Sequence, residues 1–135
     1  MSRHDFNDLI AWQKAKDLAV KIYRATGTGA LSKDFGMRDQ LCRSAVSIAS
    51  NLAEGDERDT DKDAVRFFFI AKGSLAELRT QLLICSEVGL LDRSDYERLE
   101  SDCATLAKIL GSLIKFRQKA ERPGRREPSR GRNQV

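Results

Sequence analysis

Residues 40–58 read QLCRSAVSIASNLAEGDER, and two patterns run through this stretch together. Leu41, Ala45, Ile48 and Leu52 recur at steps of three and four, which is the spacing of one face of an α-helix. Polar residues keep the same steps on a second face: Gln40, Ser44, Ser47, Asn51, Glu54 and Arg58. The stretch therefore predicts a helix over about 37–55 with one apolar and one polar stripe.

Three further segments have the same helical periodicity, and short breaks separate them. We predict these helices over about 7–25, 61–88 and 92–119, with Thr60 or Asp59 as the N-cap of the middle one. No stretch alternates convincingly with a period of two, so strands are not expected. Both prolines lie near the C-terminus, where they do not interrupt a core helix. The pattern predicts an all-α fold, an antiparallel up-down-up-down four-helix bundle.

The third predicted helix contains FFFI at residues 67–70, which places apolar side chains around most of its circumference. Such a helix is usually buried on more than one side. Gly73 follows in the same helix, where a glycine costs about 1 kcal/mol relative to alanine. We therefore expect another backbone to come close at Gly73 and the small-residue second helix to pack tightly against the third.

The polar stripe of the second helix has two possible surroundings. Polar groups are costly to bury unless they find hydrogen-bond partners, so the stripe faces either water or a helix with matching groups. The third helix offers Ser74 and Glu77, which suggests a network shared between the two helices. Glu54 and Arg58, at i and i+4, are also placed to pair locally.

The residues of a typical catalytic or metal site are scarce in this sequence. His4 is the one histidine, and Cys42, Cys85 and Cys103 are widely spaced at apolar helical positions, where we interpret them as core residues. The acidic run EGDERDTDKD (54–63) is not followed by the glycine and glutamate that a calcium loop requires. We expect no enzymatic activity, metal or cofactor.

No apolar run approaches the ~20 residues that a membrane span needs. The first residues also lack the apolar core of a secretory signal. We therefore expect a cytoplasmic protein without membrane association.

Positive charge is concentrated at the C-terminal end. The whole chain has a net charge of +4, but residues 115–135 hold eight Lys or Arg and two Glu, a net +6, which leaves −2 for the other 114 residues. The sequence predicts a bundle over 1–120 and a basic tail over 121–135 that is disordered on its own. Such a tail suits an acidic partner, most simply RNA or DNA.

Phosphate contacts of this kind are sequence-tolerant and salt-sensitive. The residues that we expect to make them are Lys115, Arg117, Lys119, Arg122, Arg125, Arg126, Arg130 and Arg132. Alternatively, the tail only solubilises the chain.

The stretches at 40–58 and 66–82, RFFFIAKGSLAELRTQL, together resemble the bacterial four-helix-bundle proteins known as 23S ribosomal RNA intervening-sequence proteins. LIAWQKAKDLAVKIY (9–23) is similar to the first helix of that family, and the resemblance covers about residues 6–117. It implies a homopentameric ring around a central channel. It also implies a signature polar network of Gln40, Arg43, Ser47, Asn51, Glu54, Arg58, Ser74 and Glu77.

Two functions follow as expectations. The first is a non-enzymatic oligomer that binds RNA or DNA backbone through its basic C-terminal residues. The second comes from relatives of the same fold, the accessory variability proteins of diversity-generating retroelements, which resemble basic ring-shaped partners of a reverse transcriptase. By that resemblance the chain would be a protein-interaction scaffold with a reverse transcriptase as its partner.

Overall fold

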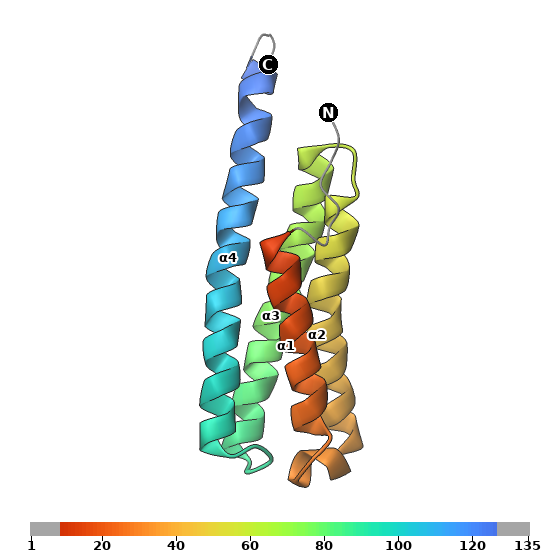
Figure 1. Ribbon diagram of the computed structural model, residues 1–135, viewed down its shortest axis with the longest axis vertical. Coiled ribbons are helices and arrows are strands. Elements are labelled where there is room, and N and C mark those ends of the chain that lie inside the picture. The colour runs from red at the N-terminus through yellow and green to blue at the C-terminus, as the bar shows by residue number, and fades with distance from the viewer. Residues whose placement is uncertain (1–8, 127–135) are drawn as a thin grey trace.

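The computed structural model describes residues 9–126, and in this part the chain is helical without strands (Figure 1). Its helices are α1 (Ile10–Thr26), α2 (Phe35–Asp56), α3 (Asp61–Glu87) and α4 (Arg93–Arg126), with a short 3-10 helix, η2 (Ala30–Lys33), before α2. Each helix packs against the next, and α1 also packs against α4. The prediction of an all-α fold with four helices is confirmed.

Side-chain caps fix where three of the helices begin. The carboxylate of Asp34 accepts a hydrogen bond from the Met37 N–H at 3.0 Å, and the Thr60 hydroxyl accepts one from the Asp63 N–H at 3.1 Å. Asp92 does the same for the Asp95 N–H at 3.0 Å. These bonds satisfy N–H groups that have no partner inside the first helical turn.

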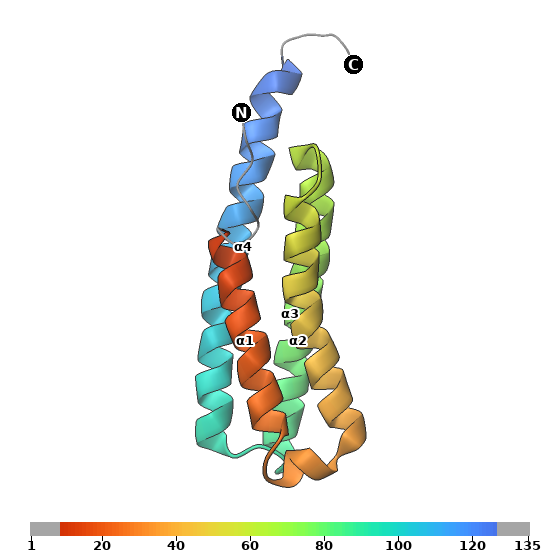
Figure 2. The same ribbon diagram turned by 45° about the vertical axis from the view of Figure 1, so that its right-hand side comes forward.

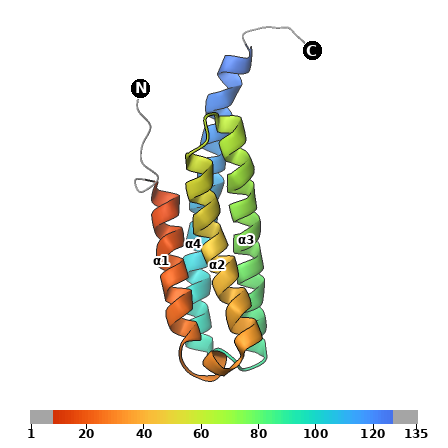
Figure 3. The same ribbon diagram turned by 90° about the vertical axis from the view of Figure 1, so that its right-hand side faces the viewer.

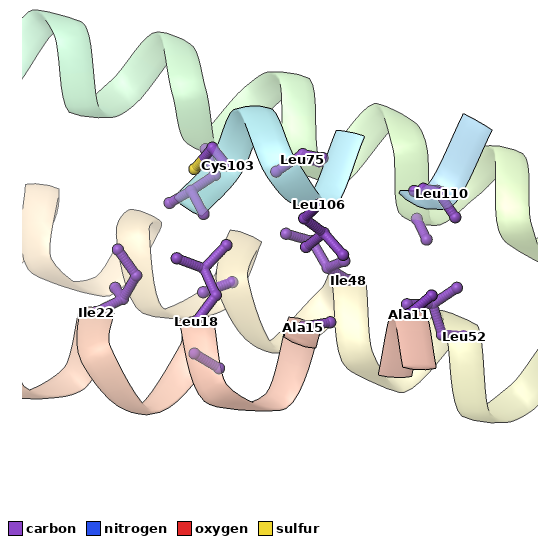
Figure 4. Packing of buried hydrophobic residues seen from close by; sticks show 14 of the residues in the cluster. Ala11, Ala15, Leu18, Ile22, Ile48, Leu52, Leu75, Cys103, Leu106 and Leu110 are labelled. Carbon is purple, nitrogen blue, oxygen red and sulfur yellow. The ribbon is translucent and has the colours of Figure 1, made fainter. Parts of the chain in front are cut away.

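The core lies where the apolar stripes of the helices meet. Figure 4 shows Leu18, Ile48 and Leu106, from three different helices, directed into the same interior. The predicted stripe residues of α2 are at most 1% exposed: Leu41, Ala45, Ile48 and Leu52. Side chains of this kind each gain about 1.5–3 kcal/mol from leaving water, which is the main force that holds the four helices together.

Part of the apolar surface of α3 faces outward. Phe68 is fully buried, but Phe69 and Ile70 are 47% and 50% exposed, and Leu83 and Ile84 further along are 40% and 44% exposed. The described part of the chain therefore covers only one side of the FFFI run.

The expectation of a close backbone contact at Gly73 is wrong within a single chain. Gly73 is exposed, and a Cβ added there would have no neighbour within 4 Å. The close approach occurs at Gly55, where a Cβ would lie 2.7 Å from Cε1 of Phe68 and 3.0 Å from the carbonyl oxygen of Ala64. Gly55 is therefore the residue that lets α2 and α3 converge before the turn that joins them.

Helix α4 is the longest element and rises past the start of α1 (Figures 1 and 2). The sequence predicted its end near Lys119, but it continues to Arg126. A helix of 34 residues is about 51 Å long. Its last part consequently has no α1 beside it.

Candidate nucleic-acid interface

The facing sides of α2 and α3, which lie side by side in Figure 3, carry a chain of polar contacts. The buried Ser44 hydroxyl donates to Oε1 of Gln81 at 3.1 Å, and Nε2 of Gln81 donates to Oε1 of Gln40 at 3.3 Å. The hydroxyls of Ser47 and Ser74 are 2.8 Å apart. The polar groups between the two helices thus satisfy one another, which removes most of the cost of burying them.

The rest of the predicted network divides into two groups. Nδ2 of Asn51 donates to the carbonyl oxygen of Ser47 at 2.9 Å, and Arg58 pairs with Glu54 at 2.6 Å. Arg43 and Glu77 are exposed and form no ion pair among the described residues. Both line a pocket of about 290 Å³ together with Gln40, Ser44, Ser47 and Gln81.

Gln81 joins Ser44 to Gln40, yet sequence reasoning overlooked it. The signal was present, because Ser74, Glu77 and Gln81 repeat at steps of three and four on α3. They form a second polar stripe opposite the stripe of α2, and the two stripes face each other.

Arg117 is placed differently from the other predicted phosphate-binding residues. Its Nε lies 2.5 Å from Oδ1 of Asp61 and its Nη1 lies 3.5 Å from Oδ1 of Asp56. The guanidinium also stacks over the Phe68 ring, 5.4 Å from its centroid, and the side chain is only 15% exposed. The ion pairs of Arg117 therefore join α4 to the end of the α2–α3 pair.

The outward face of α4 carries a basic stripe, which we define as Arg98, Lys108, Lys115 and Lys119 together with the hydroxyl residues Ser101, Thr105 and Ser112. All seven are exposed and follow one another at steps of three and four. From Cys103 to Ala120 the helix contains no acidic residue. Lys108, Lys115 and Lys119 form no ion pair among the described residues, whereas Arg98 pairs with Asp95.

Arg122, Arg125 and Arg126 belong to α4. Arg130 and Arg132 lie outside the described residues. Sequence reasoning did not include Lys108, although its spacing of seven residues from Lys115 places it on the same face.

Two of the three cysteines are packed in the core. Burial raises the pKa of the Cys85 thiol to about 11 and that of Cys103 to about 12. Cys42 is half-buried, with its sulfur 3.5 Å from the Thr26 hydroxyl. The two buried thiols are therefore held in their neutral, unreactive form.

The described residues contain no group of three or more His, Cys, Asp or Glu arranged to hold a metal ion. None of their helices is long and apolar enough to cross a membrane.

An apolar groove of about 650 Å³ runs between α1 and α2. Val20, Tyr23 and Val46 line it and are 39%, 56% and 40% exposed. The other lining residues are Trp12, Lys16, Ala19, Arg24, Ala49, Ser50 and Ala53. The groove is a second apolar surface, separate from the exposed face of α3.

Comparisons with known proteins identify the family to which this bundle belongs. Residues 7–112 match the family described as 23S rRNA-intervening sequence protein. A solved structure from Bacteroides thetaiotaomicron, described as a protein with unknown function from the S23 ribosomal protein family, is similar with a TM-score of 0.72 and 27% identity over 78% of this chain and 99% of that chain. No curated protein matches significantly. Because the family match spans most of the chain and the fold agrees, the chain belongs to the 23S rRNA-intervening sequence protein family.

Proposed function

We propose that the chain binds the phosphate backbone of RNA or DNA through the basic stripe of α4, without catalysing a reaction. The observation that supports this proposal is the exposed and unpaired state of Lys108, Lys115 and Lys119 on a stretch of α4, residues 103–120, that contains no acidic residue. Lysines without acidic neighbours along the same helix produce a positive potential at its surface.

The hydroxyls between the cations suit the same ligand. Ser101, Thr105 and Ser112 can donate hydrogen bonds to phosphate oxygens that the lysines attract. Such contacts fix the position of a backbone and do not read its bases. The expected binding is therefore sequence-tolerant and weakened by salt.

The family match ends at residue 112, before Lys115 and Lys119. The proposal consequently rests on the surface of this chain and not on a property of its family. Arg117 is omitted from the contact set because two carboxylates already pair with it. The proposed contact set still includes the arginines at 122, 125, 126, 130 and 132, because they lie in the basic C-terminal sequence.

The first prediction tests the basic stripe directly. The double variant Lys115→Gln/Lys119→Gln should bind a fluorescently labelled RNA more weakly than the unaltered protein. The slope of log K against log salt, measured by fluorescence anisotropy, should become shallower by roughly 0.7–0.9 for each phosphate contact removed.

The matched control is Lys33→Gln/Arg43→Gln, which removes the same charge from exposed positions outside α4 and outside the exposed apolar face of α3. It should leave the slope nearly unchanged. Equal losses in the two double variants would indicate a response to net charge alone. An RNA affinity that does not depend on salt would rule out the proposed mechanism.

We further propose that a second copy of the chain covers the exposed apolar face of α3. This face contains Phe69, Ile70, Leu83 and Ile84, and Gly73 in its middle leaves room for close approach of another helix. The groove between α1 and α2 is a separate apolar surface that could receive it. A contact between two different surfaces repeats from copy to copy and gives a ring where the rotation between copies closes, which is the arrangement of the homopentamer implied by the family resemblance.

The second candidate function is a scaffold for another protein, such as a reverse transcriptase. The apolar groove favours it, because Val20, Tyr23 and Val46 line it and are placed to bury apolar side chains of a partner protein. Under this function the Lys115→Gln/Lys119→Gln variant would lose RNA affinity but still hold its protein partner.

A further inference from the structure

The side of α4 next to the basic stripe carries an aromatic ring with unusual surroundings. Phe116 is 68% exposed, the highest value among the large apolar side chains of the described residues. It follows Lys115 directly and precedes Lys119 by three positions, which puts it beside Lys119 on the helix surface. The C-terminal part of α4 extends beyond the first residues of α1, so α1 does not lie beside this part of α4 (Figure 2).

Among the described residues, no cation lies over the Phe116 ring. The other exposed phenylalanines each have a cation over the ring: Arg38 lies 5.2 Å from the centroid of Phe35, and Lys72 lies 5.9 Å from that of Phe69. Among the described residues no such contact exists for Phe116, although two lysines are near it in sequence. The ring is therefore available to a planar group from outside the chain.

From this arrangement we infer that Phe116 is a stacking platform for an unpaired nucleobase, and that the basic stripe prefers single-stranded to double-stranded nucleic acid. This inference rests on the proposed backbone binding and adds a substrate class to it. In a single strand the phosphate can lie on Lys115 or Lys119 while its base turns onto the adjacent ring. In a duplex the base faces are already stacked on one another, so Phe116 has no partner.

The size of the effect follows from the chemistry of stacking. A base stacked on an aromatic side chain contributes roughly 5- to 150-fold to affinity, and it does so with every base because each has a π-face. The platform would thus add strand-type selectivity without adding sequence specificity. It would serve RNA and DNA alike, since stacking does not involve the sugar.

The experiment compares four proteins: the unaltered full chain, Phe116→Ala, Phe116→Tyr and Phe35→Ala. Each is titrated by anisotropy with a single strand of about 12 nucleotides, as RNA and as DNA, and with the corresponding duplexes. Phe35→Ala is the matched control, because Phe35 is 67% exposed and lies at the start of α2, on another helix. A strand with 2-aminopurine reports stacking directly through its fluorescence.

We expect Phe116→Ala to bind both single strands at least fivefold more weakly and to bind the duplexes as before. Phe116→Tyr should retain single-strand affinity, and Phe35→Ala should change neither. The 2-aminopurine signal should respond to the unaltered protein and to Phe116→Tyr, but not to Phe116→Ala.

Three results would overturn the inference in distinguishable ways. If Lys115→Gln/Lys119→Gln weakens binding but Phe116→Ala does not, backbone binding stands and the stacking platform is wrong. If Phe116→Ala changes the oligomeric mass and leaves RNA affinity intact, the ring belongs to a contact between copies. If no protein binds any strand, the proposed function fails and the platform fails with it.

Discussion

Two glycines inside helices, Gly55 and Gly73, have opposite surroundings and should respond oppositely to alanine. At Gly55 a new Cβ meets Phe68 and the carbonyl oxygen of Ala64, so Gly55→Ala should destabilise the fold by about 1–3 kcal/mol despite the better helix propensity of alanine. At Gly73 the space is open, and Gly73→Ala should stabilise the isolated chain by about 0.5–1 kcal/mol. Urea unfolding of the two variants measures both changes.

The same pair also probes self-association. If a neighbouring copy packs closely over Gly73, the alanine variant should unfold at higher urea as a monomer yet associate more weakly. Destabilisation of the monomer by Gly73→Ala would show that its surroundings are more crowded than the structure indicates.

The buried thiols give a prediction with a defined pH dependence. Burial raises the pKa values of Cys85 and Cys103 from 9.0 to about 11 and about 12, so at pH 8 their thiolate fractions are roughly 100-fold or more below those of an unfolded chain. A thiol reagent should therefore modify them only after denaturation. Mass spectrometry after timed labelling measures the number of modified thiols, with a urea-denatured sample as the control.

The sign for stability follows from the same shifts. A thiol whose pKa is higher in the folded state favours folding fully below the unfolded pKa, and this contribution disappears as the pH rises toward the folded value. These two cysteines should therefore destabilise the fold above about pH 9. Rapid labelling of Cys103 in the native protein at pH 8 would contradict its burial.

At the scale of single residues, the sequence predicted buried positions better than it predicted roles. The stripe of α2 is buried as expected because a helical period alone determines which side chains share a face. The period does not reveal which glycine has a neighbour, since that depends on how two helices converge. It also could not separate Arg117 from Lys115 and Lys119, because the carboxylates of Asp56 and Asp61 come from distant positions.

Arg117 connects α4 to α2 and α3, and its loss should weaken the packing of these helices against one another. Arg117→Gln removes the cation that pairs with Asp56 and Asp61, whose side chains are 12% and 31% exposed, and should cost about 2–4 kcal/mol. Arg66→Gln is the control, because its pair with Asp63 is well exposed and should be worth at most about 1 kcal/mol. Denaturant unfolding compares the two variants.

A structural role also predicts where the damage appears. Hydrogen exchange should increase at the α2–α3 turn and in the second half of α4 in the Arg117→Gln variant. If this variant loses RNA affinity without any loss of stability, Arg117 contacts phosphate after all.

The helix ends were predicted to within a few residues except at the end of α4. Caps such as Thr60 are local, so the sequence contains what is needed to place them. The end of α4 was predicted near Lys119, before the basic tail, but the helix continues past Pro123 to Arg126, since a proline removes one hydrogen bond and does not by itself end a helix. The short η2 before α2 has no periodicity to detect and was missed.

For the molecule as a whole, the exposed face of α3 leads to a prediction about assembly. Ile70→Glu places a charge in the middle of the proposed contact between copies and should weaken association by roughly 100-fold, because the carboxylate would have to be buried without a partner. Native mass spectrometry at several protein concentrations should show a pentamer for the unaltered chain and mainly monomer for the variant.

Phe35→Glu is the control, since Phe35 is equally apolar and 67% exposed but lies outside the α3 face. It should remain pentameric. A pentamer that survives Ile70→Glu would exclude this face from the contact, and a monomeric unaltered chain would exclude the ring itself.

The architecture has a consequence for the order in which the chain folds. Only residues 57–60 separate α2 from α3, so this hairpin closes a small loop and can form while the chain is still being synthesised. Helix α1 packs against α2, its neighbour in sequence, and also against α4, as the pairing of Lys21 with Asp102 across 81 positions illustrates. The part of the core that α1 shares with α4 therefore forms only after α4 has been made.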